Sequence, residues 1–392
     1  MGWADGLVDG RMTTEEKREA KVFLEDILRI STVNGEKHEE RLAIFIARYL
    51  QEHGIPAYTE SVGQGMANVV ARVDGIDPGY TLVLNGHLDT VPFGDRAQWD
   101  SDPDIPVERG GRLYARGASD MKSGLASLVM ALCLTIKRRK RPRCSLIFLG
   151  TADEERGGAG AHQAVKSHIL DESDAVIIAE PTGGSVGLAQ KGCLWLRLSV
   201  EGRTSHGAYP WEGVNAIMKG FAFCNKLDHF IRTYHHELLG DATCCLSHAR
   251  GGIVPNMVPD HAEFFLDIRT VPPLRIDDVL EKAKAIAAKM EKDTPSLFFH
   301  FSLLNRREAI ETATSEQETI KLQRCIKAVT GVAPKNTGIN FFTDASILTK
   351  NRPELPVILF GPGQPAVAHK NNEWVDLQSY YQAIQIYCCY VC

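Results

Sequence analysis

The sequence predicts an α/β protein: a mostly parallel sheet with helices on both faces, interrupted by an inserted two-layer α+β domain. Continuous apolar runs of strand length alternate with helical segments over residues 81–178, as in a sheet covered on both sides. Apolar and polar residues alternate in the strand-like stretches of residues 192–305, which is typical of antiparallel strands with one exposed face. The α/β rhythm then returns. We therefore expect a larger catalytic domain in two parts, residues 1–191 and 306–392, and an inserted domain over residues 192–305.

The first predicted elements are two helices, over residues 14–30 and 36–53, preceded by a leader over residues 1–11. Thr13 or Thr14 is the expected cap of the first helix, with Glu16 near the reciprocal capping position. The second helix shows apolar residues at helical spacing and stops at a glycine.

Alternating strands and helices follow. In the larger domain we expect strands over residues 81–84, 145–149, 175–178 and 356–360, and helices over residues 123–136, 159–167 and 315–329. In the inserted domain we expect strands over residues 194–200, 262–268 and 297–303, and helices over residues 214–230 and 279–290. These five segments account for all but one strand of a β-α-β-β-α-β order, which is typical of a compact two-layer fold and is the order that we expect here.

Composition narrows the class of protein. Hydrophobic residues make up 44% and charged residues 24% of the chain, which is ordinary for a globular protein. The net charge of −5 gives no field that favours nucleic acid or an anionic membrane. One basic run, residues 137–143, closes an apolar-periodic segment, and we interpret it as a helix C-terminus, where cations are favoured.

No apolar stretch reaches the length of about 18 to 20 residues that crosses a bilayer, and residues 1–20 contain no signal-peptide core. We therefore expect a cytoplasmic protein. Six of the ten cysteines lack zinc-finger spacing and are expected to be buried or surface thiols in a reducing compartment. These are Cys224, Cys244, Cys245, Cys388, Cys389 and Cys392.

Residues that bind metals follow the predicted strands. His87, Glu154, Glu155 and Glu180 come just after strand ends, and His369 lies in the loop after a further strand. Ligands of open α/β sheets bind beyond the carboxyl ends of the strands, so these side chains are expected at one edge of the sheet. Asp120 stands at the expected start of a helix and is reached from a short strand over residues 112–115.

Charge and ligand chemistry favour two Zn²⁺ ions, with Co²⁺ or Mn²⁺ as substitutes. Asp120, Glu155 and Glu180 bring three negative charges that would repel one another without metal. Imidazole nitrogen and carboxylate oxygen together suit zinc. Our hypothesis is that His87 and Glu180 hold one ion, that Glu155 and His369 hold the other, and that Asp120 bridges them.

Two carboxylates that lie close to predicted metal ligands in the sequence are left for other roles. Glu154 is free to act as a general base that takes a proton from water and passes it to the leaving nitrogen. Asp89, two residues after His87, is a candidate acceptor for the other ring N–H of that histidine.

Taken together, these stretches resemble the M20 zinc peptidase and deacylase family, which includes acetylornithine deacetylase, succinyl-diaminopimelate desuccinylase and aminoacylase-1. Order and spacing agree from about residue 20 to the end of the chain. The matching stretches are residues 85–92, 113–124, 153–155, 180–181, 361–363 and 368–369. The resemblance implies the same metal ligands and a zinc-exopeptidase-like catalytic domain.

The resemblance also implies roles for residues of the inserted domain, which would serve as a lid and dimerisation domain. His206 would stabilise the developing oxyanion, often from the partner subunit of a homodimer. Asn256 and Arg269 would hold the substrate, the arginine by clamping a carboxylate. Members of the family often have a cis peptide after the bridging aspartate, which here is the bond between Asp120 and Met121.

The function expected from these features is a di-zinc amidohydrolase that removes an acetyl or succinyl type acyl group from an amino acid with a free carboxylate. Its partner would be a small N-acyl amino acid or dipeptide, with no nucleic acid and no membrane. A dipeptidase or carboxypeptidase with the same centre is the alternative within the enzyme class. A non-catalytic metal-binding scaffold is the alternative outside it, and the presence of Glu154 beside a complete ligand set argues against it.

Overall fold

The computed structural model describes residues 11–36 and 38–392, which form two compact units. The first unit contains the described residues through Leu188, then Thr312–Thr337 and Ile347–Cys392. The second contains Ala189–Glu311 and Gly338–Ser346. Almost all of the expected leader lies outside the described residues, as does Lys37 near the start of the second predicted helix.

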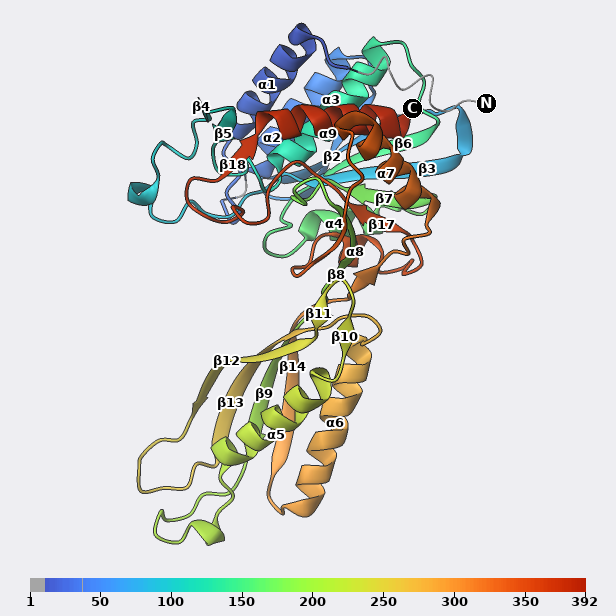
Figure 1. Cartoon of the computed structure of the whole chain (residues 1–392). Helices are drawn as coiled ribbons and strands as arrows, with labels where there is room; N and C mark the ends of the chain where they lie inside the picture. Colours follow the sequence, from blue (N-terminus) through green and yellow to red (C-terminus); the bar gives the residue numbers. More distant parts are fainter. Residues whose placement is uncertain (1–10, 37) are drawn as a thin grey trace. The chain divides into compact units, whose positions relative to one another are not determined.

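The first unit is built on a mixed sheet (Figure 1). Its strands follow the spatial order β1-β2-β6-β3-β7-β17-β8, where β6, β3, β7 and β17 are parallel and the outer pairs are antiparallel. The bounds are β1 Ala57–Gly63, β2 Met66–Val73, β3 Asp77–His87, β6 Cys144–Thr151, β7 Ala175–Ile178, β8 Val186–Gln190 and β17 Val357–Leu359. The central strands are buried almost throughout because helices cover both faces. The predicted fold class is confirmed.

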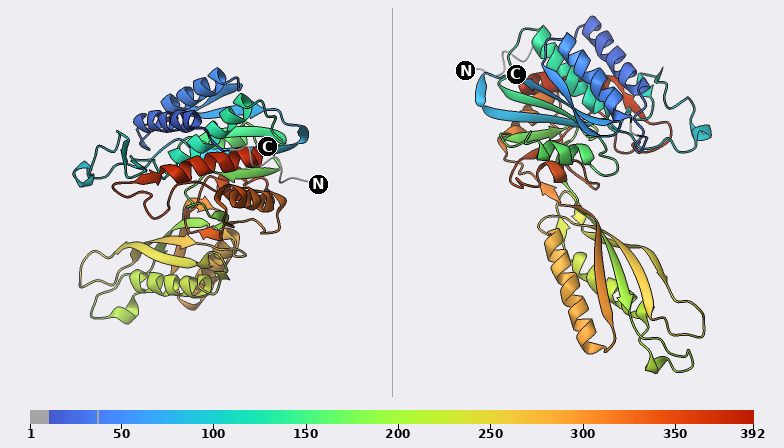
Figure 2. Two further views of the ribbon diagram at one scale, coloured as in Figure 1. Left: turned by 45° about the horizontal axis from the view of Figure 1, so that its top comes forward. Right: turned by 180° about the vertical axis from the view of Figure 1, so that it is seen from behind.

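Helices α3 and α9 lie on one face of this sheet, and α4 lies on the other (Figures 1 and 2). The bounds of the helices are α1 Thr14–Arg29, α2 Glu39–Glu52, α3 Lys122–Lys137, α4 Ala159–Lys166, α7 Gln317–Thr330, α8 Ala345–Leu348 and α9 Leu377–Val391. The predicted reciprocal cap of α1 is present, since Glu16 N donates to Thr13 Oγ1 and Thr13 N donates to Glu16 Oε2. Helix α3 is almost entirely buried, which explains its nearly unbroken apolar sequence.

Several elements were not among those predicted. The β1–β2 hairpin and helix α9 are the largest of them. Short strands complete the structure: β4 Val107–Arg109, β5 Arg112–Tyr114 and β18 Trp374–Asp376 form one small antiparallel sheet, in which β5 confirms the strand predicted over residues 112–115. The others are β10 His235–His236, β11 Gly240–Asp241, β15 Ile310–Glu311 and β16 Asn336–Ile339.

The second unit contains an antiparallel sheet of order β12-β13-β9-β14 with α5 and α6 on one face (Figure 1). The bounds are β9 Cys193–Glu201, α5 Ala216–Ile231, β12 Thr243–Gly251, β13 His261–Arg269, α6 Ile276–Asp293 and β14 Phe298–Arg307. Alternate residues of β9, such as Leu194, Leu196 and Leu198, enter a core shared with the helices. This is the β-α-β-β-α-β order expected from the sequence.

The segment Gly338–Ser346 packs with the second unit, although it was expected to belong to the larger domain. Thr343 Oγ1 donates to Gln190 Oε1, and Lys191 N donates to Ile339 O. These hydrogen bonds join segments that are about 150 residues apart in the chain, a relation that local sequence patterns do not reveal.

The expectation of free thiols is wrong for Cys389, which forms a disulfide with Cys325. Helices α7 and α9 pack side by side and bring the two Cα atoms to 5.8 Å, within the range for a disulfide. Disulfides persist mainly in oxidising compartments, so the cytoplasmic location stays a prediction. No helix in residues 11–36 and 38–392 has the length and apolarity needed to span a bilayer.

Candidate metal centre

Three neighbouring strands deliver acidic and imidazole side chains to one edge of the sheet in the first unit. Strand β3 ends at His87, which pairs in register with Thr151, the last residue of β6. Glu154 and Glu155 follow in the loop after β6, and Glu180 follows β7. Because the three strands are parallel, their carboxyl ends lie together, as the sequence predicted.

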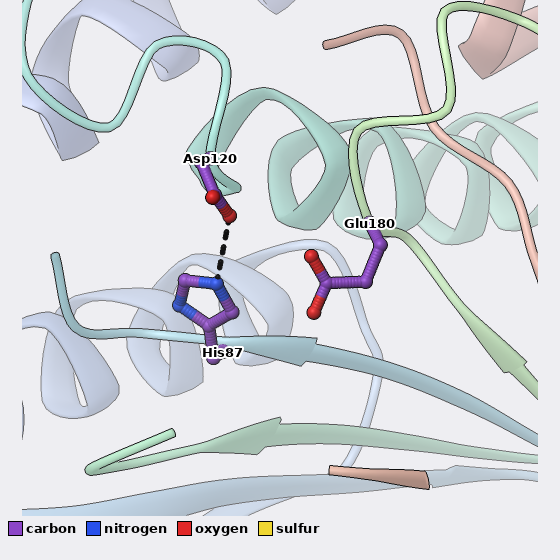
Figure 3. A group of neighbouring side chains, drawn as sticks. All are labelled: His87, Asp120 and Glu180. Carbon is purple, nitrogen blue, oxygen red and sulfur yellow. Dashed lines mark hydrogen bonds and ion pairs between the residues drawn. The ribbon is translucent and has the colours of Figure 1, made fainter. Parts of the chain in front are cut away.

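The first ligand group consists of His87, Asp120 and Glu180, all of them buried. Figure 3 shows the carboxyl groups of Asp120 and Glu180 directed toward the imidazole of His87. His87 Nε2 lies 3.1 Å from Asp120 Oδ1, and one donor atom from each of the three residues lies within 4.8 Å of the others.

The second ligand group shares Asp120 and adds Glu155 and His369. His369 Nε2 lies 3.2 Å from Asp120 Oδ2 and 3.0 Å from Glu155 Oε1. Asp120 therefore presents one carboxylate oxygen to each group. The peptide bond between Asp120 and Met121 is cis, which the family resemblance led us to expect.

The orientation of His87 is fixed by Asp89, but not by the group that we expected. His87 Nδ1 lies 2.9 Å from the backbone oxygen of Asp89 and 3.7 Å from its carboxylate. A donor at Nδ1 leaves Nε2 as the atom with a free lone pair toward the site. The Asp89 carboxylate instead accepts hydrogen bonds from the backbone N–H groups of Glu154 and Glu155 and from the side chain of Asn34. It holds the loop that carries two of the acidic side chains.

The electrostatics of the centre favour additional positive charge. Burial acts to lower the pKa of His87, but the hydrogen bond to Asp120 and the nearby carboxylates raise it well above its ordinary value. Hydrogen bonds to Asp120 and Glu155 raise the pKa of His369 to about 10. Burial acts to raise the pKa of Asp120, but the hydrogen bonds from His369 and His87 hold it well below its usual range. The carboxylates thus stabilise positive charge at the centre. When no metal ion is bound, protonated imidazoles carry that charge.

The residues present fit a pair of divalent metal ions. Each group contains one imidazole, one carboxylate of its own and a share in the Asp120 carboxylate. Nitrogen and carboxylate oxygen donors without thiolate are typical of catalytic rather than structural zinc sites. Glu154 is buried beside this ligand set.

Glu373 supports the centre and was missed by sequence reasoning. Its buried carboxylate accepts hydrogen bonds from the backbone N–H groups of Gly117 at 3.1 Å, Ser119 at 2.8 Å and Asp120 at 2.9 Å, and from Arg116 Nη1 at 2.7 Å. It therefore fixes the loop that positions the shared aspartate. Its place four residues after His369 was the only signal in the sequence.

Lys122 is a second buried residue that was missed. Its ammonium group donates to the backbone oxygens of Ile27, at 3.0 Å, and Ile30, at 2.7 Å. Burial lowers the pKa of Lys122 to about 7. The contacts join the start of α3 to the end of α1, so this lysine anchors the segment that follows Asp120.

The residues expected to bind substrate lie in the second unit. His206 and Asn256 are exposed, and their loops are joined because Gly207 N donates to Asn256 O. Arg269 is half-buried at the end of β13 and donates to both carboxylate oxygens of Asp267, at 2.7 and 3.0 Å. His206 pairs with Met257, just before the start of β13, so His206 and Arg269 lie at opposite ends of this strand. Eight residue steps along β13 correspond to about 26 Å.

The sequence is similar to a known family of peptidases and to proteins with named activities. The model of peptidase family M20/M25/M40 matches residues 83–392. A probable succinyl-diaminopimelate desuccinylase of Staphylococcus aureus is 28% identical, covering 96% of this chain and 97% of its own length. An acetylornithine deacetylase of Myxococcus xanthus is 30% identical, covering 82% of each chain.

Solved structures show the same fold at lower sequence identity. An aminopeptidase of Bacillus cereus has a TM-score of 0.79 at 17% identity, covering 96% of this chain and 98% of its own. An M20 family metallo-carboxypeptidase of Sulfolobus solfataricus has a TM-score of 0.76 at 18% identity, covering 95% of this chain and 98% of its own. The similarity thus extends over both units.

Proposed function

Because the chain belongs to peptidase family M20/M25/M40 and is a metal-dependent hydrolase of amide bonds, we propose that it is a di-zinc deacylase. Its substrate would be an amino acid with a free carboxylate and an acetyl or succinyl group on nitrogen. The names of the two relatives, a desuccinylase and a deacetylase, support this substrate class.

The observation that carries the proposal is the position of Asp120 between two ligand groups. Its Oδ1 faces His87 and its Oδ2 faces His369, at 3.1 and 3.2 Å. His87 and Glu180 would hold one zinc ion, and Glu155 and His369 would hold the other. When bound, zinc supplies positive charge that polarises the substrate carbonyl and lowers the pKa of a water molecule.

The protein itself supplies the proton transfer. Glu154 would take the proton of the attacking water and give it to the leaving nitrogen, and burial strengthens this role by limiting solvent access. The Asp89 carboxylate supports it by holding the Glu154 amide at 3.0 Å, which fixes the backbone of the base. Arg269 would exchange its contact with Asp267 for the substrate carboxylate.

The positions of His206 and Arg269 support a homodimer. The two residues lie at opposite ends of β13, too far apart for both to contact one small substrate from the same chain. If both act on the substrate, as proposed, a second copy of the chain would supply His206 as the oxyanion donor. His206→Ala should then lower kcat by about 10²-fold or more. Active hybrids formed by mixing His206→Ala with Arg269→Ala subunits would test the sharing between chains.

The decisive experiment separates metal binding from chemistry. Glu154→Gln should keep two zinc ions per chain, measured by metal analysis, and lose turnover by at least about 10²-fold. The matched control is Glu172→Gln, which changes an exposed glutamate and should retain full activity. Parent-like turnover by Glu154→Gln would refute the assignment of the base, and fewer than two zinc ions in the parent would refute the di-zinc centre.

The alternatives differ in substrate. A panel of N-acetyl amino acids, N-succinyl amino acids and dipeptides should show hydrolysis of the N-acyl compounds first. Hydrolysis of dipeptides alone would establish the dipeptidase or carboxypeptidase instead. Metal binding without hydrolysis of any amide would indicate a non-catalytic scaffold.

A further inference from the structure

A large cavity lies in the first unit, and none of the proposed metal ligands lines it. Its volume is about 1440 Å³, and its walls come from α1, the end of α3 with the loop that follows, α7 and α9. Pockets that hold small organic molecules commonly measure about 300–1,000 Å³. The space is therefore sufficient for a molecule larger than an inorganic ion. We call it the basic cavity, for the charges of its lining.

The lining of the basic cavity is strongly cationic. Among the described residues that line it, eight are arginine or lysine and none is aspartate or glutamate. The whole chain has more acidic than basic residues, 49 against 44. The eight cations are Arg11, Lys17, Arg138, Lys140, Arg141, Arg143, Lys321 and Arg324. An acidic protein thus concentrates positive charge around one hollow.

Only part of this charge is compensated. Arg138 forms an ion pair with Glu16, and Arg143 and Lys321 both contact Glu318. In the part of the chain that the structure describes, the other five cations have no carboxylate within ion-pair distance. Lys140, Arg141 and Arg324 are also exposed, so water and small anions reach them.

The remaining walls add neutral donors and apolar surface. Gln378, Gln382 and Gln385 follow one another at helical spacing on α9 and all line the basic cavity. A glutamine amide donates hydrogen bonds without adding negative charge. Ile320 and Val329 contribute apolar contacts. Cations and amide donors suit a multiply charged anion, and the apolar contacts suit an organic body attached to it.

We propose that the basic cavity binds an organic phosphate, with its phosphate group on Arg141 and Arg324. A guanidinium group can donate two parallel hydrogen bonds to two oxygens of one phosphate. A phosphate also carries more charge and more acceptor atoms than a single carboxylate. The basic cavity and the metal centre share no residue, so binding at the cavity can be measured separately from hydrolysis. The phosphate belongs either to a soluble metabolite or to a lipid headgroup, and the test below distinguishes the two.

The first test is calorimetric titration of the zinc-loaded protein with adenosine, adenosine 5′-monophosphate and adenosine 3′,5′-bisphosphate. These probes share one organic body and carry zero, one and two phosphate groups. Affinity should rise with each phosphate and fall as NaCl increases, because the contacts are ionic. Inorganic phosphate should bind more weakly than the monophosphate if the organic body contributes.

Variants then locate the binding. Arg141→Gln and Arg324→Gln should each weaken binding of the bisphosphate at least about tenfold, because each removes charge-assisted hydrogen bonds. The matched control is Arg41→Gln, an exposed position on α2 outside the basic cavity, which should bind as the parent does. Sedimentation with vesicles that contain phosphatidic acid is the lipid arm. Vesicle binding that depends on Arg141, without binding of the nucleotides, would assign the phosphate to a lipid.

The proposal is overturned if neither the nucleotides nor the vesicles bind saturably. It is equally overturned if both arginine variants bind like the parent. Either outcome leaves the hydrolytic function untouched, because hydrolysis is measured separately and none of the changed residues belongs to the metal centre.

Discussion

Glu373 should be essential for the metal centre although it is not a proposed ligand. Its carboxylate accepts the backbone N–H groups of Gly117, Ser119 and Asp120 and forms a buried ion pair with Arg116. Glu373→Ala removes all four hydrogen bonds and leaves the buried Arg116 guanidinium without a carboxylate to balance its charge. Glu373→Gln keeps the shape of the side chain but removes its charge and replaces one acceptor oxygen by a donor.

The size of the effect follows from these contacts. Four hydrogen bonds to a charged group, at about 1.5–3 kcal/mol each, would sum to about 6–12 kcal/mol, but such contributions are not additive. Breaking one buried ion pair typically costs about 3–5 kcal/mol, which we take as the expected loss for Glu373→Ala. Glu373→Gln still accepts at one oxygen, so its loss should be smaller. Misplacement of Asp120 should weaken zinc binding about 10–100-fold, as for other residues that orient ligands.

The assay measures stability and zinc affinity separately. Urea unfolding of the metal-depleted protein should show a lower midpoint for both variants, with Glu373→Ala the more strongly affected. Competition with a chelator should show the weaker zinc binding of Glu373→Gln, which is the variant that keeps its packing. Glu52→Gln, an exposed position on α2, is the control and should match the parent in both measurements. Parent-like zinc affinity of a folded Glu373→Gln would refute the idea that Glu373 positions Asp120.

Three further predictions concern other parts of the first unit. Burial raises the pKa of Glu39 from 4.5 to about 7, so the folded state binds its proton more tightly than the unfolded state. The contribution of this group to stability is present below about pH 4.5 and is lost as the pH rises to about 7. Glu39→Gln should therefore stabilise the protein by up to about 3 kcal/mol at pH 8 and not at pH 4.5. An equal shift in the urea midpoint at both pH values would contradict this. Asp89→Asn leaves one acceptor oxygen for the amides of Glu154 and Glu155 and for Asn34, and should weaken zinc binding about 10–100-fold in chelator competition, whereas the exposed Asp26→Asn should not. The disulfide leaves eight of the ten cysteines free, so eight thiols should react with a thiol reagent in the denatured, unreduced protein. Ten reactive thiols would refute the disulfide. Cys325→Ser should lower the free energy of unfolding by about 2–5 kcal/mol, while Cys245→Ser, at an exposed free cysteine, should have little effect.

Much of the fold and of the metal centre follows from local sequence patterns. The apolar runs at residues 81–84, 145–149 and 175–178 predicted the strands that became β3, β6 and β7. The side chains that follow them were predicted to meet, and His87 and Glu180 do so. These inferences succeed because strand burial and strand-end position are encoded within a few consecutive residues.

Helix α9 shows where local patterns fail. Leu377–Val391 carries aromatic and cysteine residues as well as aliphatic ones, and its buried side includes Tyr380, Tyr387 and Tyr390. Tyr380 and Tyr387 donate hydrogen bonds to the backbone oxygens of Ala20 and Phe360, which lie 360 and 27 residues away in the chain. Buried tyrosines need such partners, and only the folded structure supplies them.

The sequence by itself indicated the α/β architecture, an inserted domain and a set of candidate metal ligands, because each strand, helix and strand-end side chain is encoded in a short run of consecutive residues. The tertiary structure decided how these side chains are held. In the folded protein the Asp89 carboxylate accepts hydrogen bonds from the backbone of Glu154 and Glu155. The Glu373 carboxylate accepts one from the backbone of Asp120, and Cys325 forms a disulfide with Cys389. The tertiary structure also separated His206 from Arg269 by the length of β13. These are contacts between residues distant in the chain, whose geometry depends on packing and hydrogen bonding across the whole unit rather than on local pattern.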